Sequence, residues 1–530
     1  MTDAQQQKDF ADMWKGLPKK LFRNTIVGWV EMAILLLSAL VIPPILITRL
    51  GKEGYGVWAL AGQVTAYLAV LDLGVSSSVG RFVAKYSVVK DSANLARTIN
   101  SAILLFLASS ILVVLASLIL RTVFSGYFNF SPTYYSIRKS LILWGGIGVA
   151  LAFPLRIGMG VLEGFHHFHF IYLFRAIGAL LKLTLIALLF GVLRNENLLL
   201  LLFVGITATI LPNLLMCMYA YKKLLDMPFG FGQVNYSNIK EIWSLSMLTL
   251  VGTFGALLFN QGQIIGVGKI VGPESVTIYA IPVMLLTYGR MAVSYMATAF
   301  RPLASHMQAL DQHEYLRKFN IFGTKVSFII CLFLSVIIIV FGQMFLRLWL
   351  FSTQLQNEDF LQISSVLSIM VIGFAFGTPQ IVTISMLLGT SRQRIYAVVS
   401  LAASILGLFI GVFLMLKTSL GLYGMAVGWT SVMVFKGVIA FPIVACRSFK
   451  IKLQDYIYGA YWPPLKAGAI LAIAAYGLKT FAGEMTIVML VLNVLLCLFI
   501  YAFAVYFLCL DQSQKEFLQG LVARFKAYFV

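Results

Sequence analysis

The sequence predicts an all-α polytopic membrane protein with about 14 transmembrane helices. Of its 530 residues, 60% are hydrophobic and only 11% are charged, and the mean hydropathy is +0.90. A soluble domain carries about a quarter charged residues. The apolar residues form about fourteen continuous runs of roughly twenty residues, the length that a helix needs to cross about 30 Å of hydrocarbon. Because the runs are continuously apolar and do not alternate, the pattern excludes a transmembrane β-barrel.

The predicted spans follow each other with short connections. In chain order we expect them at 24–48, 56–80, 98–120, 141–163, 171–193, 198–220, 242–268, 277–300, 322–346, 361–388, 395–416, 423–445, 463–482 and 485–509. The longest loop between them has about twenty residues, so no loop can form a separate soluble domain.

The first half of the chain recurs in the second half, about 220 residues later. Near the start of each half, Leu50-Gly51-Lys52-Glu53 matches Val271-Gly272-Pro273-Glu274, and Arg81-Phe82-Val83-Ala84 matches Arg301-Pro302-Leu303-Ala304. Further along, the set Gly148, Pro154, Leu162 and Gly164 aligns without a gap on the set Gly373, Pro379, Leu387 and Gly389. Finally, Val204-Gly205-Ile206-Thr207 matches Val427-Gly428-Trp429-Thr430. The alternative is chance similarity among helices rich in Gly, Leu and Val. A duplication pairs helices 1 to 6 with helices 7 to 12 and leaves two extra helices at the C-terminus. Because six is even, both halves keep one orientation, and we expect a pseudo-two-fold axis along the membrane normal.

The repeat and the charges divide the chain into four parts. We expect a cytoplasmic interfacial N-terminus (1–23), an N-lobe with helices 1–6 (24–223), a C-lobe with helices 7–12 (224–445), and helices 13–14 with a cytoplasmic amphipathic tail (446–530). Most of the 40 Lys and Arg fall on the side that this topology places in the cytoplasm, together with both termini. The formal charge of +20 therefore reflects basic side chains that set the topology and lie near anionic lipid. It does not indicate a nucleic-acid partner.

Several cations lie deep in the predicted spans. A charge at mid-span costs about 2.5–3.5 kcal/mol on insertion scales, so such residues face a watery cavity or a partner. Arg suits phosphate because its planar fork donates two parallel hydrogen bonds, and Lys adds a point charge. The candidate substrate-binding residues of a cationic cavity are Arg290, Arg156, Lys182, Lys436 and, at the outer end of the first span, Arg49. The alternative is that they form buried ion pairs, for example Arg156 with Glu31 or Asp72.

Polar residues in the spans are the candidates for coupling to an ion. Glu31 and Asp72 could bind a proton, because burial raises the pKa of a carboxyl group toward neutrality, and Asn260 could bind a cation or form hydrogen bonds between helices. We expect no cofactor, although transport could be coupled to H⁺ or Na⁺. His166, His167 and His169 lack a second ligand cluster, so we expect no metal site. The chain contains no Walker motif, nucleophile elbow or CxxC pair, so the sequence does not indicate an enzyme or an ATP-driven pump.

Three stretches of the first two spans carry a family resemblance. These are Leu50-Gly51-Lys52-Glu53-Gly54-Tyr55-Gly56-Val57-Trp58, Tyr67-Leu68-Ala69-Val70-Leu71-Asp72-Leu73-Gly74 and Arg81-Phe82-Val83-Ala84-Lys85-Tyr86. They resemble the N-terminal signature of bacterial polysaccharide transporters, the O-antigen and lipid-linked oligosaccharide flippases of the multidrug/oligosaccharidyl-lipid/polysaccharide exporter superfamily. The resemblance implies two six-helix lobes around a V-shaped cavity that opens to each membrane face in turn. In related lipid flippases, arginines on the first, second and eighth helices handle the diphosphate, and Arg290 lies on the matching eighth helix.

The function favoured at this point is a flippase of the bacterial cytoplasmic (inner) membrane. Its substrate would be undecaprenyl-diphosphate-linked oligosaccharide, moved from the inner to the outer leaflet during polysaccharide, O-antigen or lipopolysaccharide biosynthesis. We expect a monomer whose partners are this lipid-linked sugar, membrane lipid and the polysaccharide polymerase machinery. One alternative is a cation-coupled multidrug exporter of the same fold, which would need an acidic cavity. Others are a membrane-embedded glycan polymerase or ligase, which commonly needs a sizeable outer loop, and a non-transporting scaffold.

Overall fold

The computed structural model describes residues 19–72, 74–224, 236–298, 300–481, 486–512 and 514–515. The described chain is helical and contains no strand. Eleven of its helical segments are long and apolar enough to cross a membrane, so the predicted fold class is confirmed. Most of the predicted interfacial N-terminus and of the amphipathic C-terminal tail lies outside the described residues.

The N-lobe contains the first six spans. Its elements are α2 (Lys19–Leu68), η1 (Ala69–Asp72), α3 (Val75–Val88), α4 (Ser92–Tyr127), η2 (Pro132–Tyr134), α5 (Arg138–Leu155), α6 (Ile157–Gly164), α7 (Phe168–Ile186), η3 (Ala187–Val192) and α8 (Leu198–Lys223). The 50-residue α2 holds the first span and the start of the second, because the chain turns sharply at Gly51, which has φ 70°. Glycine adopts this left-handed φ without the steric cost of a side chain.

The second span differs from the prediction of one continuous helix over 56–80. It breaks after Leu68 into η1 and then α3. Gly74 has φ 75°, which an α-helix cannot contain. The Asp72 carboxylate accepts hydrogen bonds from the Ser76 hydroxyl at 2.8 Å and the Ser76 backbone N–H at 3.3 Å, so it stabilises the restart of the helix.

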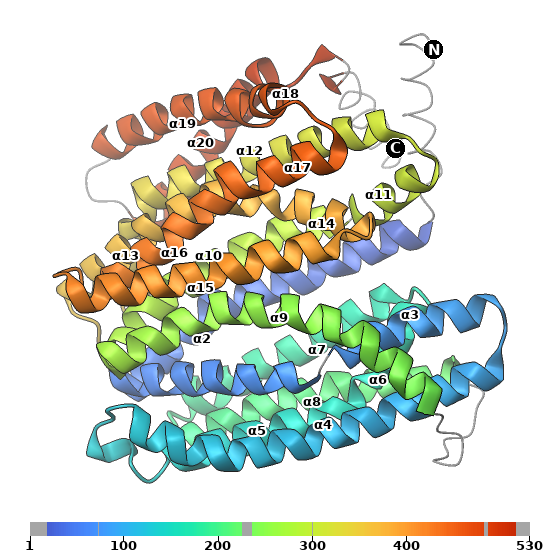
Figure 1. Ribbon diagram of the computed structural model, residues 1–530. Coiled ribbons are helices and arrows are strands. Elements are labelled where there is room, and N and C mark those ends of the chain that lie inside the picture. The colour runs from blue at the N-terminus through green and yellow to red at the C-terminus, as the bar shows by residue number, and fades with distance from the viewer. Residues whose placement is uncertain are drawn as a thin grey trace, which may run out of the picture.

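The C-lobe contains the next six spans, and two further spans follow it. Its elements are α9 (Tyr236–Ile270), α10 (Pro273–Thr298), α11 (Phe300–Ala309), α12 (His313–Trp349), α13 (Asn357–Gly377), η5 (Thr378–Gln380), α14 (Ile381–Gly389), α15 (Gln393–Lys417), α16 (Leu422–Phe435), η6 (Lys436–Ala440) and α17 (Phe441–Phe449). The last elements are α18 (Leu453–Tyr456), η7 (Ile457–Tyr461), α19 (Trp462–Phe481) and α20 (Ile487–Leu508). In Figure 1 the blue-to-green N-lobe and the green-to-orange C-lobe form two bundles, and the red α19 and α20 lie outside the C-lobe.

The glycine and proline anchors of the repeat occupy equivalent places in the two lobes. Gly51 and Gly272 both have a left-handed backbone, with φ 70° and 120°, at the turn between the first two spans of each lobe. Pro154 lies at the break between α5 and α6, and Pro379 lies at η5, the break between α13 and α14. A proline removes a backbone donor and bends its helix at these points.

The packing partners of the anchors are equivalent as well. A Cβ on Gly164 would lie 2.5 Å from the Val83 side chain, and one on Gly389 would lie 2.3 Å from the Arg301 carbonyl oxygen. Both matched glycines thus allow α3 and α6, or α11 and α14, to approach closely. The duplication is therefore visible in three dimensions, while the predicted domain boundaries stay predictions.

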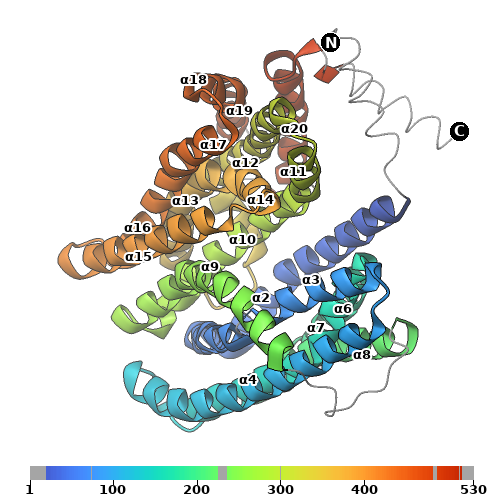
Figure 2. The ribbon, with the colours of Figure 1, turned by 45° about the vertical axis from the view of Figure 1, so that its right-hand side comes forward.

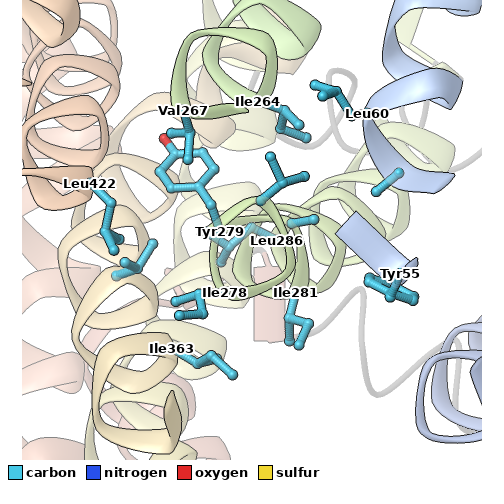
Figure 3. Packing of buried hydrophobic residues seen from close by; sticks show 14 of the residues in the cluster. Tyr55, Leu60, Ile264, Val267, Ile278, Tyr279, Ile281, Leu286, Ile363 and Leu422 are labelled. Carbon is cyan, nitrogen blue, oxygen red and sulfur yellow. The ribbon is translucent and has the colours of Figure 1, made fainter. Parts of the chain in front are cut away.

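Among the side chains that the structure describes, the largest apolar core joins the two lobes toward one end of the molecule. We call this the Gly51 end, which holds the loops at Gly51, Gly272 and after α12, and we call the opposite end the Gly164 end. The shared core combines side chains of α2, α9, α10, α13 and α16; Figure 3 shows Leu60 of α2 near Ile264 of α9, and Tyr279 near Val267. At the Gly164 end each lobe has its own separate core. Helices α2, α9 and α10 lie along the junction of the lobes (Figure 2).

Candidate functional site

A small cavity lies among the helices of the C-lobe, and a water-sized sphere can occupy about 20 Å³ of it. Side chains of α9, α10, α13, η5 and α16 line it. The polar residues in this lining are Asn260, Gln263, Thr287, Arg290, Thr378 and Trp429, and none of the residues that the structure places around the cavity is acidic. This cavity is lined by the C-lobe alone, and the cavity between the lobes that the resemblance implies stays a prediction.

Arg290 is the cation of this cavity. Its Nη2 donates a hydrogen bond to Asn260 Oδ1 at 3.2 Å, and Asn260 Nδ2 donates to the Ala256 carbonyl one turn earlier on α9 at 2.7 Å. Asn260 is therefore oriented by its own helix and in turn orients the guanidinium. A guanidinium within hydrogen-bond distance of the amide oxygen disfavours a metal cation at Asn260, because like charges repel strongly away from bulk water.

Lys436 lies where α16 changes into the π-helical turn η6, a local distortion that is frequent at functional sites. Gly437 lets this turn pack closely against α13, since a Cβ there would lie 2.1 Å from the Phe376 carbonyl oxygen. The Lys436 ammonium is 4.9 Å from the ring centroid of Phe259, and it feels the charge of Arg290. Two cations thus share the interior of the C-lobe.

Lys182 is the corresponding cation of the N-lobe. It belongs to α7, and its Nζ lies 5.8 Å from the ring centroid of Trp58 on α2. Such a cation–π contact stabilises a desolvated ammonium group only partly. Within the described ranges no acidic side chain forms an ion pair with Lys182, Arg290 or Lys436.

The other two predicted cations bind the protein itself. Arg156 Nη1 lies 3.4 Å from Asp72 Oδ2, so one of the ion pairs considered from the sequence is formed. Arg49 Nε donates to the Phe190 carbonyl at 3.0 Å and its Nη2 to the Gly191 carbonyl at 3.4 Å, at the end of η3. A cation near these carbonyls stabilises the C-terminal end of a helix.

Glu31 lies at the junction of the lobes toward the Gly164 end. Its side chain is 1% exposed, and Arg175 Nε of α7 lies 3.0 Å from its Oε1. Tyr295 on α10 of the C-lobe donates its hydroxyl to Glu31 Oε2 at 3.0 Å, and the Tyr172 and Tyr295 rings meet edge to face at 6.1 Å. Sequence reasoning selected Glu31 but missed Arg175 and Tyr295, because nothing in the sequence places α7 and α10 beside the first span.

A second set of polar contacts closes the Gly51 end. Lys52 Nζ lies 2.6 Å from Asp359 Oδ1 of α13 and 3.9 Å from Glu274 Oε2, and the Lys52 carbonyl accepts a hydrogen bond from Thr277 at 2.6 Å. Trp349 Nε1 donates to the Leu40 carbonyl at 2.6 Å. We call these contacts the Gly51-end clasp. They join the N-lobe to three C-lobe helices.

A profile of the polysaccharide biosynthesis protein family matches residues 21–308, more than half of the chain. The chain belongs to this family. It is 22% identical to the uncharacterized membrane protein EpsK of Bacillus subtilis (strain 168) over 434 residues, 79% of this chain and 82% of that protein. It is 21% identical to a putative O-antigen transporter of Shigella flexneri over 414 residues, 77% of this chain and 94% of that protein.

Two solved structures show the same fold as this polysaccharide biosynthesis protein. Lipid II flippase MurJ in an inward closed conformation matches with a TM-score of 0.69 and 14% identity, over 91% of this chain and 97% of that one. An inward-facing multidrug resistance transporter of the MATE family, MOP superfamily, matches with a TM-score of 0.67 and 14% identity, over 81% of this chain and 99% of that one. These likenesses show the fold, and the predicted resemblance to polysaccharide transporters is confirmed by the family match. Of the three cations without an acidic partner, Lys182 and Arg290 fall within the family match and Lys436 follows it.

Proposed function

We propose that this polysaccharide biosynthesis protein is a flippase that moves undecaprenyl-diphosphate-linked oligosaccharide from the inner to the outer leaflet of the bacterial cytoplasmic membrane. The observation that carries the proposal is the set of deep cations without an acidic partner: Lys182 in the N-lobe, and Arg290 and Lys436 in the C-lobe. An uncompensated charge at membrane depth is costly and marks a substrate or ion path. A diphosphate would supply the missing negative charge.

The two lobes supply the movement. Helix α2 packs against α7, which carries Lys182, and against α10, which carries Arg290. The lobes share an apolar core at the Gly51 end and have separate cores at the Gly164 end. If the Gly164 end faces the cytoplasm, as the positive-inside rule predicts, rocking about α2 would expose the cations first to the cytoplasm and then to the outside. The names of two similar proteins, a putative O-antigen transporter and a lipid II flippase, support this proposal.

The remaining predicted residues take other roles in the proposal. Arg156 and Arg49 hold helices together through Asp72 and through backbone carbonyls. Glu31 is the proposed coupling group, because it is buried and bonds to both lobes. Protonation of Glu31 would weaken its ion pair with Arg175 and its hydrogen bond from Tyr295. The two lobes could then separate at the Gly164 end. Partnership with a polysaccharide polymerase and a monomeric state stay predictions.

A cation-coupled multidrug exporter is the second candidate, since a multidrug resistance transporter has the same fold. Such a protein would bind cationic drugs. The described interior opposes this with three cations that lack an acidic partner, and Glu31, a buried acid at the lobe junction, is ion-paired.

The proposal is tested by reconstituting the purified protein into liposomes with a fluorescently labelled undecaprenyl-diphosphate-linked oligosaccharide. Flipping is measured as the fraction of label that a membrane-impermeant reagent can reach over time. We expect Lys182→Gln and Arg290→Gln each to lower the flipping rate at least tenfold, because each loses one charge–phosphate contact worth about 1.5–3 kcal/mol. Arg290→Glu should abolish flipping.

The matched control is Lys466→Gln, which removes an exposed cation that lies 5.5 Å from the Trp462 ring at the start of α19. It should flip at the rate of the unaltered protein. Wild-type rates in Arg290→Glu, or equal losses in Lys466→Gln, would reject the cationic path. Transport of drug cations and no flipping would instead favour the second candidate.

A further inference from the structure

Two buried donors beside the C-lobe cavity have no acceptor. Trp429 is 7% exposed and Thr378 is 1% exposed. Both line the cavity, yet Trp429 Nε1 and Thr378 Oγ1 form no hydrogen bond within the described chain. Native proteins rarely leave a buried donor without an acceptor, so each such group calls for a ligand, an ion or a water molecule.

The other polar side chains of the cavity are already engaged within the protein. Thr287 donates to the Val283 carbonyl at 2.7 Å. Gln263 donates to the Asn260 carbonyl at 3.2 Å, and its Oε1 accepts from Tyr279 at 2.8 Å. The groups left over are therefore donors: the Trp429 N–H, the Thr378 hydroxyl, and the N–H groups of Arg290 that do not bond to Asn260.

The charge of the cavity and its free donors favour the same kind of ligand. Arg290 lies in the lining, Lys436 is close enough to interact with it electrostatically, and no acid is among the lining residues that the structure describes. A cavity of free donors and positive charge selects for an anion and against a metal cation, because both the hydrogen bonds and the field favour negative charge. A water molecule could accept from two of these donors, but it would leave the charge uncompensated.

We propose that this cavity binds one small inorganic anion, of the size of a halide, between Arg290, Trp429 and Thr378. The space that a water-sized sphere can occupy is about 20 Å³, and about 10–15 Å³ measured in this way holds one water molecule. The cavity therefore has room for one small ion and leaves no room for a diphosphate with its sugars and lipid. The anion would keep the two C-lobe cations compensated when no substrate is present. The site follows from the cavity alone and stands whatever substrate the transporter carries.

The test measures binding of radiolabelled chloride to the purified full-length protein in detergent, by equilibrium dialysis at constant ionic strength with gluconate as the replacing anion. We expect saturable binding of one chloride per protein. Bromide should compete, and inorganic phosphate should compete more weakly because it is larger. Tighter competition by phosphate than by bromide would identify the site as a phosphate-group site and overturn the halide proposal.

Two conservative variants isolate the free donors. Trp429→Phe removes the N–H and replaces the indole, which stacks on Phe259 at 5.7 Å, by a smaller aromatic ring, and Thr378→Val removes the hydroxyl and keeps the shape. Each should weaken chloride binding about tenfold, and Arg290→Gln should abolish it. The control Trp462→Phe removes the N–H of a tryptophan that is 49% exposed, and it should bind chloride as the unaltered protein does.

The outcomes separate the proposal from its alternatives. Absence of saturable binding, or binding that Trp429→Phe and Thr378→Val leave unchanged, overturns the site. If Trp429→Phe or Thr378→Val loses chloride binding but still flips the lipid, the anion site is confirmed and transport does not depend on it. Loss of flipping with normal chloride binding in Lys182→Gln would support the proposed function independently.

Discussion

Replacing Lys52 by Met should weaken the Gly51-end clasp. The change removes the ammonium that lies 2.6 Å from Asp359 and 3.9 Å from Glu274, and it keeps most of the apolar stem. Asp359 retains its other role, because its Oδ2 still accepts from the Gln356 backbone N–H at 3.0 Å at the start of α13. The variant therefore tests the contact between the lobes without removing the helix cap.

The size of the effect follows from the burial of the pair. The Lys52 side chain is 26% exposed and that of Asp359 is 10% exposed, so the bond is more valuable than a surface ion pair, which contributes about 0–1 kcal/mol. It falls short of the full 1.5–3 kcal/mol of a shielded hydrogen bond to a charged group. We expect a loss of about 1–2 kcal/mol, which raises the population open at the Gly51 end by about 5- to 30-fold.

The opening is read from a cysteine placed at Val57, which is fully buried in the core that the lobes share. Its reaction with a small maleimide, quantified by mass spectrometry of the peptide that contains it, should quicken 5- to 30-fold in Lys52→Met. The matched control is Lys318→Met, which breaks a 2.9 Å pair with Glu314 within one helix at 62% and 64% exposure. It should leave the rate unchanged. Equal rates in the two variants would refute the reasoning that the clasp holds the lobes together.

Two further predictions concern the contacts between the lobes. Gly56→Ala would place a Cβ 1.9 Å from a backbone oxygen of α10, so it should lower the free energy of unfolding in detergent by about 1–3 kcal/mol or more. The control Gly62→Ala is on the same helix, and because its Cβ would have nothing within 4 Å, it should be neutral. Similar losses in both variants would contradict the close packing of α2 on α10. Tyr295→Phe removes a hydrogen bond between the lobes at the Gly164 end. A cysteine at Gly28, whose Cβ fits 3.5 Å from Tyr172, should then react with maleimide several-fold faster, and an unchanged rate would show that the hydroxyl does not hold that end closed.

The sequence alone was enough for the fold class, because its evidence is local. Continuous apolar runs require helices in a membrane, and the spacing of the glycine and proline anchors was enough to align the two lobes. The positive φ of both Gly51 and Gly272 and the helix breaks at Pro154 and Pro379 are equivalent in space as they are in sequence. The break in the second span escaped prediction, because the apolar run continues through it, whereas the α-helix ends at Leu68 and begins again after Gly74.

Which charges are free was decided by the tertiary structure alone. The sequence grouped Arg156 and Arg290 as candidates for one cavity, and it offered Glu31 or Asp72 as an alternative partner for Arg156. Folding brings Asp72 to Arg156 from another helix, whereas Arg290 meets an amide and free donors. Pairing depends on distances of a few ångströms between helices far apart in the chain, and electrostatic energy varies steeply over such distances. The composition of the spans therefore determined that cations are buried here, and only the packing of the helices determined which of them lack a counter-charge.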